Sequence, residues 1–135
     1  MRREITSHKV NPANDTLTVT ALDAPGSGGA SHLYEIQGFN SGSNPSDPFV
    51  SRHGQAATHA TVLFQNGPIG EKGVNGVTHE ALIAILIDRL EAFQGGPFAN
   101  EYNAAALDHL HLAQQHLLDR TRERMARGVE GTHEK

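Results

Sequence analysis

Apolar and polar residues alternate over short runs in the first half of the chain, at residues 16–22, 32–39 and 58–65. In the first of these runs, Leu17, Val19 and Ala21 fall on one face. A period of two with β-branched residues is typical of half-buried strands. The pattern therefore predicts a small antiparallel sheet.

Turn-forming residues separate these runs. Residues 11–15 and 23–29 combine proline, whose φ is fixed, with asparagine, aspartate or glycine, which tolerate the backbone conformations of turns. Residues 40–57 are rich in Ser, Gly, Asn and Pro and contain few apolar side chains. We expect this segment to be a long flexible loop.

In the second half of the chain the spacing becomes helical. Thr78 can cap a helix by accepting a hydrogen bond from a first-turn amide, and the Gly-Gly-Pro sequence at 95–97 ends that helix. Residues 81–87 are apolar on every face, which indicates burial by the sheet, by a second helix or by another subunit. A second helix is expected from about Asn100 to about Arg127. Its predicted apolar seam comprises Leu107, Leu110, Leu117 and Thr121, with Ala106 and Ala113 beside them.

The two halves together predict an α+β fold, in which a small N-terminal antiparallel sheet packs against a C-terminal two-helix hairpin. A chain of 135 residues is most simply a single domain, with strands and the 40–57 loop in residues 1–66, and a loop followed by the hairpin in residues 67–135. Apolar residues make up 37% and tryptophan is absent, so we expect some stability to come from self-association.

The composition also bounds where the protein acts. The polar N-terminus does not resemble a signal peptide, and no apolar run approaches the roughly 18 residues of a membrane span. Without cysteine, disulfides and thiolate chemistry are excluded. We expect a soluble intracellular protein with no membrane partner.

Positive charge is concentrated near the C-terminus, where eight residues contain four arginines although the formal net charge is −4. On a helix, Arg120 and Arg124 share a face and Arg127 stays near them. Paired guanidiniums can bind a phosphate or pyrophosphate. The alternative is a solvated helix end in which Asp119 and Glu123 neutralise the arginines, and spacing alone does not decide between the two. Because the charge is local, a small phosphorylated ligand fits better than DNA.

The loop at residues 67–76 contains several glycines and a lysine before a helix start, so its amides could bind phosphate. It contains neither the GxxxxGK[ST] nor the GxGxxG motif. On pattern alone, a structural turn in which Asn75 and Gly76 supply left-handed backbone is favoured.

Nine histidines raise the question of a metal site, which the spacing disfavours. His109 and His111 lie about 200° apart around a helix and cannot chelate one ion together. No HExxH motif is present, and no local pattern suggests a nucleophile triad. We expect no metal, no cofactor and no catalytic residues.

Several segments resemble the phage anti-Thoeris sponge family. They are Phe-Gln-Asn-Gly-Pro-Ile at 64–69, Gly-Val-Asn-Gly at 73–76, Phe-Gln at 93–94 with Gly-Pro-Phe-Ala at 96–99, and the arginine-rich run at 120–133. The resemblance is strong over the C-terminal half, whereas the N-terminal strands agree with the family's sheet in general pattern. Its members sequester, intact, the cyclic ADP-ribose isomers made by TIR-domain enzymes. Their hairpin is also similar to that of phage anti-CBASS sponges, and some members bind cyclic di- and trinucleotides at a second kind of site.

The resemblance implies a non-catalytic viral protein of immune evasion that acts in the cytoplasm of the infected bacterial host. It would sequester cyclic ADP-ribose isomers and also cyclic oligonucleotides, and so inhibit Thoeris and CBASS defence. It further implies a homodimer, with assembly into hexamers allowed. Two alternatives are a small enzyme that degrades the same signals, and an arginine-rich adaptor that binds nucleic acid or protein.

By resemblance, the cyclic ADP-ribose pocket uses an aromatic ring near the helix turn, an asparagine early in the last helix and two arginines late in it. The matching residues here are Phe93 or Phe98, Asn103, Arg120 and Arg124. The ring would stack on adenine, the amide would contact a base or ribose edge, and the guanidiniums would neutralise the pyrophosphate.

Helix length constrains this pocket. Asn103 and Arg120 are seventeen residues apart, or about 25 Å along a helix at 1.5 Å per residue. One small ligand cannot contact both in the same chain. An antiparallel pair of protomers would bring them together and create two equivalent pockets.

A second site, for the phosphates of a cyclic oligonucleotide, is expected at the loop before the first long helix. Its candidate residues are Lys72, Gly73, Asn75, Gly76 and Thr78, assisted by Arg127 and Thr132.

Overall fold

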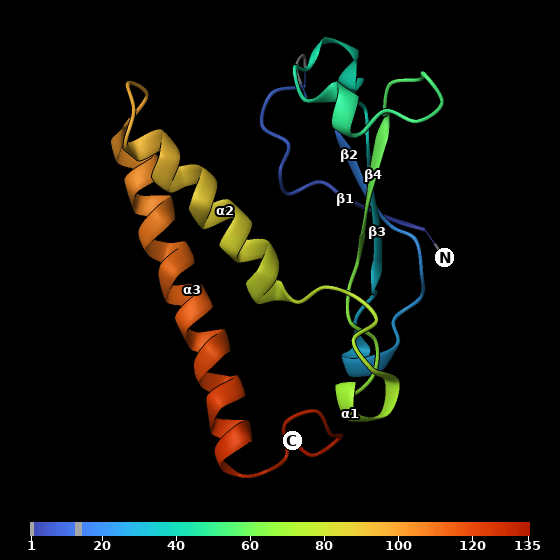
Figure 1. The fold of residues 1–135 in the computed structure, drawn as a ribbon, viewed down its shortest axis with the longest axis vertical. Helices are drawn as coiled ribbons and strands as arrows, with labels where there is room; N and C mark the ends of the chain where they lie inside the picture. The colour runs from blue at the N-terminus through green and yellow to red at the C-terminus, as the bar shows by residue number, and fades with distance from the viewer. Residues whose placement is uncertain (1, 13–14) are drawn as a thin grey trace. The chain divides into compact units, whose positions relative to one another are not determined.

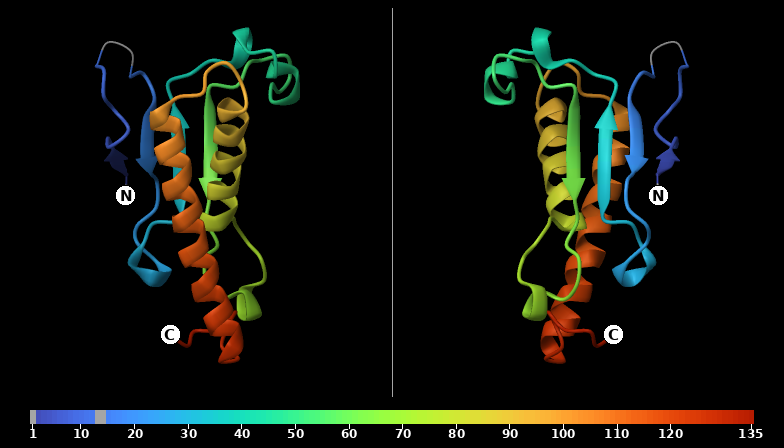
Figure 2. Two further views of the ribbon diagram at one scale, coloured as in Figure 1. Left: turned by 90° about the vertical axis from the view of Figure 1, so that its left-hand side faces the viewer. Right: turned by 90° about the vertical axis from the view of Figure 1, so that its right-hand side faces the viewer.

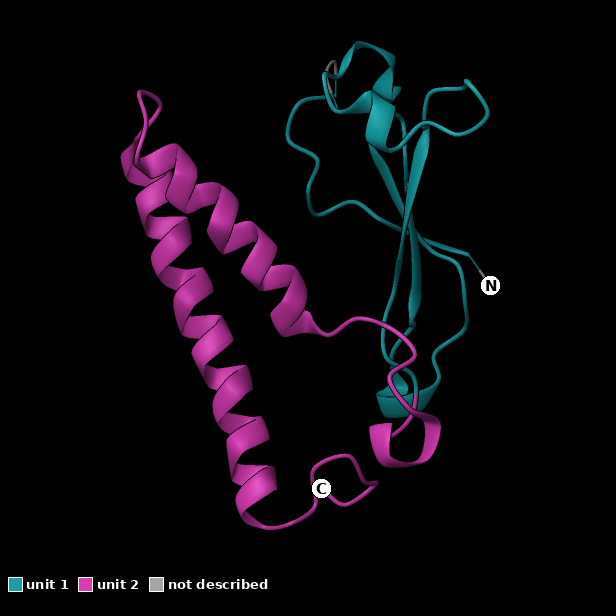
Figure 3. Ribbon diagram, in the orientation of Figure 1, with its two compact units in different colours: residues 1–66 teal, residues 67–135 magenta. Residues whose placement is uncertain are grey.

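A computed structural model of the chain describes residues 2–12 and 15–135. It divides into two compact units, residues 1–66 and residues 67–135 (Figure 3). This boundary coincides with the predicted change from strand to helix spacing. Two residues of the predicted turn at 11–15, residues 13 and 14, lie outside the described residues.

The first unit contains a four-stranded antiparallel sheet in which neighbours in sequence are neighbours in space (Figure 1). The strands are β1 (Arg3–Ile5), β2 (Thr18–Ala21), β3 (Leu33–Gln37) and β4 (His59–Leu63). The predicted α+β class, with an N-terminal antiparallel sheet followed by two long helices, is confirmed. Packing of the hairpin against the sheet stays a prediction.

The strand register explains the alternation in the sequence, because side chains at every second position share a face. One face is formed by two cross-strand rows, Ile5, Val19, Ile36 and Ala60 in the first, and Arg3, Ala21, Tyr34 and Val62 in the second. A central row of the opposite face consists of Glu4, Thr20, Glu35 and Thr61. The sheet therefore has one largely apolar face and one more polar face.

The loop between β2 and β3 is held by the Asp23 carboxylate, which accepts hydrogen bonds from the amides of His32 and Leu33, both at 3.0 Å. Ser31 Oγ adds a bond to the Asp23 carbonyl at 2.9 Å. The amide of Leu33, and then that of His32, stabilise the ionised carboxylate and hold the pKa of Asp23 below its usual value.

Residues 40–57 contain local structure: the 3-10 turns η2 (Ser41–Ser43) and η3 (Asp47–Phe49). The buried Ser41 joins the two ends of this segment, because its Oγ donates to Asp47 Oδ1 at 2.6 Å and accepts from the amide of Ala57 at 2.7 Å. The segment is thus an organised loop closed at its base, and its flexibility stays a prediction.

The second unit consists of the single-turn helix α1 (Ile69–Lys72) and a hairpin of α2 (His79–Gln94) and α3 (Glu101–Ala126). Thr78 Oγ1 caps α2 by accepting from the amide of Ala81, as predicted. Helix α3 begins after its N-cap Asn100 and ends before its C-cap Arg127, which confirms the predicted span. Gly95 ends α2 with φ −84°, so this end does not use left-handed glycine.

The inward faces of α2 and α3 follow an alternating spacing of three and four residues. In α3 the partly or fully buried positions include Asn103, Leu107, Leu110, Gln114, Leu117, Thr121 and Arg124. In α2 they include Glu80, Ile83, Ile87, Leu90 and Gln94. The predicted seam is confirmed, except that Ala106 and Ala113 are exposed and therefore lie outside it.

The two helices differ in length, and α3 continues past the start of α2 (Figure 2). Gln114 Nε2 donates to the carbonyl of Glu80 at 3.4 Å, so the first turn of α2 lies beside the middle of α3. On the outer side of α2, Ile85 is 57% and Leu86 48% exposed. Within this chain, α2 is therefore not covered all round, and burial of its outer residues by another subunit stays a prediction.

None of the helices among the described residues is long and apolar enough to cross a membrane.

Candidate functional site

The C-terminal end of α3 turns the chain back toward the helix. The amide of Val129 donates to the Arg124 carbonyl and that of Gly128 to the Met125 carbonyl, both at 3.0 Å. This pair of bonds, with Gly128 at φ 74°, is the Schellman motif, which requires a residue that accepts a left-handed backbone. Residues 128–135, called here the C-terminal segment, consequently lie against the last turns of α3.

Arg124 holds this segment. It is 6% exposed, and its Nη2 donates to the carbonyls of Val129 at 2.9 Å and Thr132 at 3.2 Å. Its Nη1 donates to the carbonyl of Glu134. Its Nε lies 3.5 Å from Glu130 Oε2, an ion pair without hydrogen-bond geometry. The guanidinium is therefore occupied largely by backbone oxygens of its own chain.

The C-terminal segment is also tied to α1. The amide of Gly70 donates to the carbonyl of Gly131 at 2.9 Å, and His133 Nδ1 lies 2.8 Å from Glu71 Oε2. A Cβ on Gly70 would approach the Gly131 oxygen to 2.8 Å, so glycine is needed for this contact. Gly131 itself has φ 81°.

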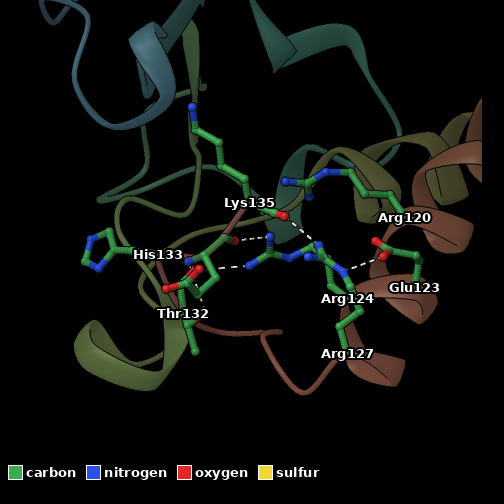
Figure 4. Close-up of a pocket in the computed structure, with 8 residues that line it drawn as sticks. Arg120, Glu123, Arg124, Arg127, Thr132, His133 and Lys135 are labelled. Carbon is green, nitrogen blue, oxygen red and sulfur yellow. Dashed lines mark hydrogen bonds and ion pairs between the residues drawn. The ribbon is translucent and has the colours of Figure 1, made fainter.

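An open pocket of about 330 Å³ lies between α3 and the C-terminal segment (Figure 4). Four cationic side chains line it, against two carboxylates and a histidine. The lining residues are Arg120, Glu123, Arg124, Arg127, Thr132, His133, Glu134 and Lys135.

The arginines of this run have different surroundings. Arg122 pairs with Asp119 at 3.0 Å, and Arg127 pairs with Glu123 and also donates to the Lys135 carbonyl at 2.5 Å. For these two, the solvated-helix-end interpretation holds. Arg120 is exposed and has no hydrogen-bond or ion-pair partner among the described residues. It is thus a cation of the pocket that is available to an anion.

The opposite end of the hairpin, at the turn, is apolar. A hollow of about 190 Å³ is lined by Ala92, Phe93, Gly96, Pro97 and Phe98. Phe98 is 72% and Phe93 42% exposed, and the Arg89 guanidinium carbon lies 5.8 Å from the centre of the Phe93 ring. Both rings can offer a face to a base, so the choice between them stays open.

The turn itself is fixed by a reciprocal pair of hydrogen bonds. Gln94 Oε1 accepts from the amide of Asn100 and Gln94 Nε2 donates to its carbonyl, both at 3.1 Å. Asn100 Oδ1 in turn caps α3 through the amide of Asn103 at 2.8 Å. The side chain of Asn103, in the first turn of α3, has no partner among the described residues.

The structure thus brings together the predicted site residues in two groups. Phe93, Phe98 and Asn103 belong to the turn end, whereas Arg120 and Arg124 belong to the arginine end of the same helix. The two groups lie about 25 Å apart at 1.5 Å of helix rise per residue. A single hairpin does not unite them.

The residues predicted for the second site are also divided. Arg127 and Thr132 line the arginine pocket, and the remaining residues, Lys72, Gly73, Asn75, Gly76 and Thr78, do not. Three of the loop residues have structural roles: Lys72 packs over Gly67, Gly73 ends α1 at φ 70°, and the Thr78 hydroxyl caps α2. Phosphate binding by this loop stays a prediction.

In the described part of the chain, no group of three or more His, Asp or Glu side chains is arranged to hold a metal ion.

Sequence reasoning missed the pocket residues His133, Glu134 and Lys135. They lie beyond the helical pattern, so no periodicity placed them near Arg120. The available signal was Gly128 directly after the last helical residues, because glycine at that position commonly reverses the chain.

Comparison with known proteins bears on the hairpin. A family described as "Acb2/Tad1, hairpin domain" matches residues 56–120. The chain is also similar to "Thoeris anti-defense 1" of Bacillus phage SBSphiJ7, with 54% identity over 76 residues. This match covers 56% of the present chain and 54% of that relative, so it spans about half the length of each.

Proposed function

We propose that the chain belongs to the Acb2/Tad1 hairpin family, whose description matches residues 56–120, and that it is a phage anti-defence protein that sequesters cyclic ADP-ribose isomers. Binding without cleavage would remove the signal made by TIR-domain enzymes and so inhibit Thoeris defence. Its relative from the Bacillus phage carries an anti-Thoeris name, which supports the proposal.

The observation that carries the proposal is the chemical complementarity of the two hairpin ends. The turn end offers aromatic rings, Phe93 and Phe98, to a base. The arginine end offers the unpartnered Arg120 and the positive potential of Arg124 to a pyrophosphate. An adenine linked to a pyrophosphate matches both, one chemistry at each end.

The distance between the ends requires a second protomer. In an isologous antiparallel dimer, the turn end of one hairpin would meet the arginine end of its partner, and the symmetry would generate two equal pockets. Asn103 would then contact a base or ribose edge in a pocket whose arginines come from the partner. The exposed Ile85 and Leu86 give the hairpin apolar surface for such an interface.

We also propose that the protein binds cyclic di- and trinucleotides at a second site, which would extend its action to CBASS signals. The candidate is the loop from Lys72 to Thr78 with Arg127 and Thr132, and hexamers would be assembled from the dimers. A cyclic trinucleotide that binds in the presence of saturating cyclic ADP-ribose isomer would support a separate site. Mutual displacement of the two ligands would contradict it.

The experiment that tests sequestration is recovery of the ligand. The protein is incubated with a stoichiometric cyclic ADP-ribose isomer, heated to denature it, and the supernatant is analysed by mass spectrometry. Intact ligand in full yield is expected. Hydrolysis products would instead support a degrading enzyme. Ligand that never co-purifies with the native protein, together with binding of duplex DNA, would support an arginine-rich adaptor.

A further inference from the structure

We infer that Arg120 and Arg124, although one helical turn apart, have separate tasks: Arg120 contacts the ligand, and Arg124 is a positioning residue that builds the pocket wall. This inference rests on the proposed function, because it assigns roles within the same site. The sequence spacing does not distinguish the two residues, whereas their burial and their hydrogen bonds do.

The hydrogen-bonding capacity of Arg124 is already used within the chain. A guanidinium has five N–H donors, and in Arg124 both terminal nitrogens donate to main-chain carbonyls of Val129, Thr132 and Glu134. With 6% of the residue exposed, little of its surface is open to a phosphate. Release of these carbonyls would leave several polar groups without partners, which is costly.

The carbonyls that accept hydrogen bonds from Arg124 lie five to ten residues away along the chain. They belong to a segment that lacks helix or strand structure of its own, and the planar guanidinium fixes three points of it at once. A lysine would supply similar charge from one atom and could not reproduce this arrangement. The shape of the segment therefore depends on the guanidinium.

The C-terminal segment supplies one wall of the pocket that faces Arg120. Thr132, His133 and Lys135 line this wall, and Glu130 balances the buried charge of Arg124. The wall has a second anchor at the close approach of Gly70 and Gly131. Loss of either anchor should disorder the same wall, so the two losses should affect ligand binding through one cause.

The first test needs no ligand. Amide hydrogen exchange is measured at Val129, whose amide donates to the Arg124 carbonyl, and at Thr132, whose amide donates to the Val129 carbonyl. The proteins compared are the wild type, Arg124→Lys and Arg120→Ala. We expect exchange in Arg124→Lys to be at least about tenfold faster, because the opening equilibrium shifts when charged hydrogen bonds are lost. Arg120→Ala should leave it unchanged. Unchanged exchange in Arg124→Lys would overturn the positioning role.

The second test is a double-mutant cycle in the full chain, read by titration with a cyclic ADP-ribose isomer. Arg124→Ala removes one anchor. Gly131→Val removes the other, because a β-branched residue is strained at φ 81°. Each single variant should weaken binding by roughly tenfold to a hundredfold, and the double variant should be little worse than the stronger single effect.

Full additivity in this cycle would show that Arg124 contacts the ligand directly, and tighter binding in Gly131→Val would show that the segment obstructs the site. Either result overturns the inference. Gly54→Val is the matched control, because Gly54 has a similar φ of 75° but lies in the other unit, where an added Cβ would meet no atom within 4 Å. Failure of the wild type to bind would instead count against the proposed function, and hydrogen exchange would still decide the role of Arg124.

Discussion

The two ends of the helical hairpin differ in chemistry, because the turn end is apolar and the arginine end is charged. At the turn end, Phe93 and Phe98 leave apolar ring surface open, and the polar groups Gln94 and Asn100 satisfy each other. At the arginine end, charged groups outnumber apolar ones, and the C-terminal segment is folded around the buried Arg124.

Each end is a complete local structure, and on the proposed function each end would be half of a recognition surface. On the proposed function, the turn end would bind a base without a counter-charge, and the arginine end would bind an anion without a stacking surface. Neither half alone distinguishes cyclic ADP-ribose from the many other nucleotides of a cell. Joining the halves across a protomer boundary would supply that discrimination, and the following changes test the two halves separately.

The largest effect is expected from charge reversal at the arginine end. Arg120→Glu places a carboxylate where the pyrophosphate should bind, and we expect affinity for a cyclic ADP-ribose isomer to fall by about a hundredfold or more, on the order of a charged hydrogen bond plus a repulsion. Isothermal titration measures this loss. Because Arg120 is exposed, the helix content should not change.

Arg122→Glu is the matched control for this substitution. Arg122 lies in the same helix and pairs with Asp119 on the surface, but it does not line the pocket. We expect its affinity to stay within about threefold of the wild type, since exposed ion pairs contribute little. Equal losses in the two variants would mean that overall charge, and not the pocket, governs binding.

An intermediate effect is expected at the turn end. Removal of a stacking ring costs about 1 to 3 kcal/mol per base, so Phe98→Ala or Phe93→Ala should weaken binding by roughly tenfold to a hundredfold. The variant with the larger loss identifies the ring that stacks. Tyr102→Ala is the control, because Tyr102 is 79% exposed and does not line the turn pocket. A similar loss in that control would count against a specific stacking site.

A smaller effect, on stability, is expected from the cap that closes the turn. Asn100→Ala removes the side-chain cap of α3, which should lower the free energy of unfolding by about 1 kcal/mol. Denaturant unfolding followed by circular dichroism measures it. Glu101→Ala, in an exposed position next to the cap, should change stability less. If Asn100→Ala were neutral, the turn end would not depend on this cap.

The smallest effect concerns the sheet unit and should leave both hairpin ends unaffected. The pKa of Asp23 is lowered in the folded protein, so its ionised carboxylate stabilises the fold above its usual value of 3.8, and this contribution is lost as the pH falls through the folded-state pKa. The stability difference between the wild type and Asp23→Asn should therefore be largest near neutral pH and shrink under acid. Urea unfolding at about pH 7 and about pH 3 tests this. A difference that grew under acid would contradict the assigned sign.

The fold was largely predictable because the decisive signals are local. The alternation around Val19 and Ala21 predicted a strand, Thr78 was predicted to cap one helix, and a second helix was predicted to start near Asn100. The structure confirms all three predictions. The segment at 40–57 was harder to predict. Its ends are held together by hydrogen bonds of the Ser41 hydroxyl to Asp47 and Ala57. Hydrogen bonds of a single serine produce no periodic pattern in the sequence, so they could not be predicted from spacing.

At the candidate site, the spacing predicted that Arg120 and Arg124 lie close together, but not how their surroundings differ. Helix geometry placed Arg120 and Arg124 on one face, yet no spacing rule states that one is open and the other buried. That division arises because the chain reverses at Gly128 and covers Arg124 with carbonyls from the C-terminal segment. The division of the second-site residues between two places has the same cause, since Thr132 reaches the arginine pocket through this reversal.

The central claim, that each pocket combines the turn end of one protomer with the arginine end of another, is tested most directly by complementation. Asn103→Ala with Phe98→Ala disables the turn end, and Arg120→Glu disables the arginine end, so neither variant alone should bind a cyclic ADP-ribose isomer. After the two are mixed and allowed to exchange subunits, half of the dimers are mixed, and each contains one intact pocket. Titration should then recover about a quarter of the wild-type binding capacity with wild-type affinity. No recovery, in a mixture that mass measurement shows to have exchanged, would contradict a shared pocket.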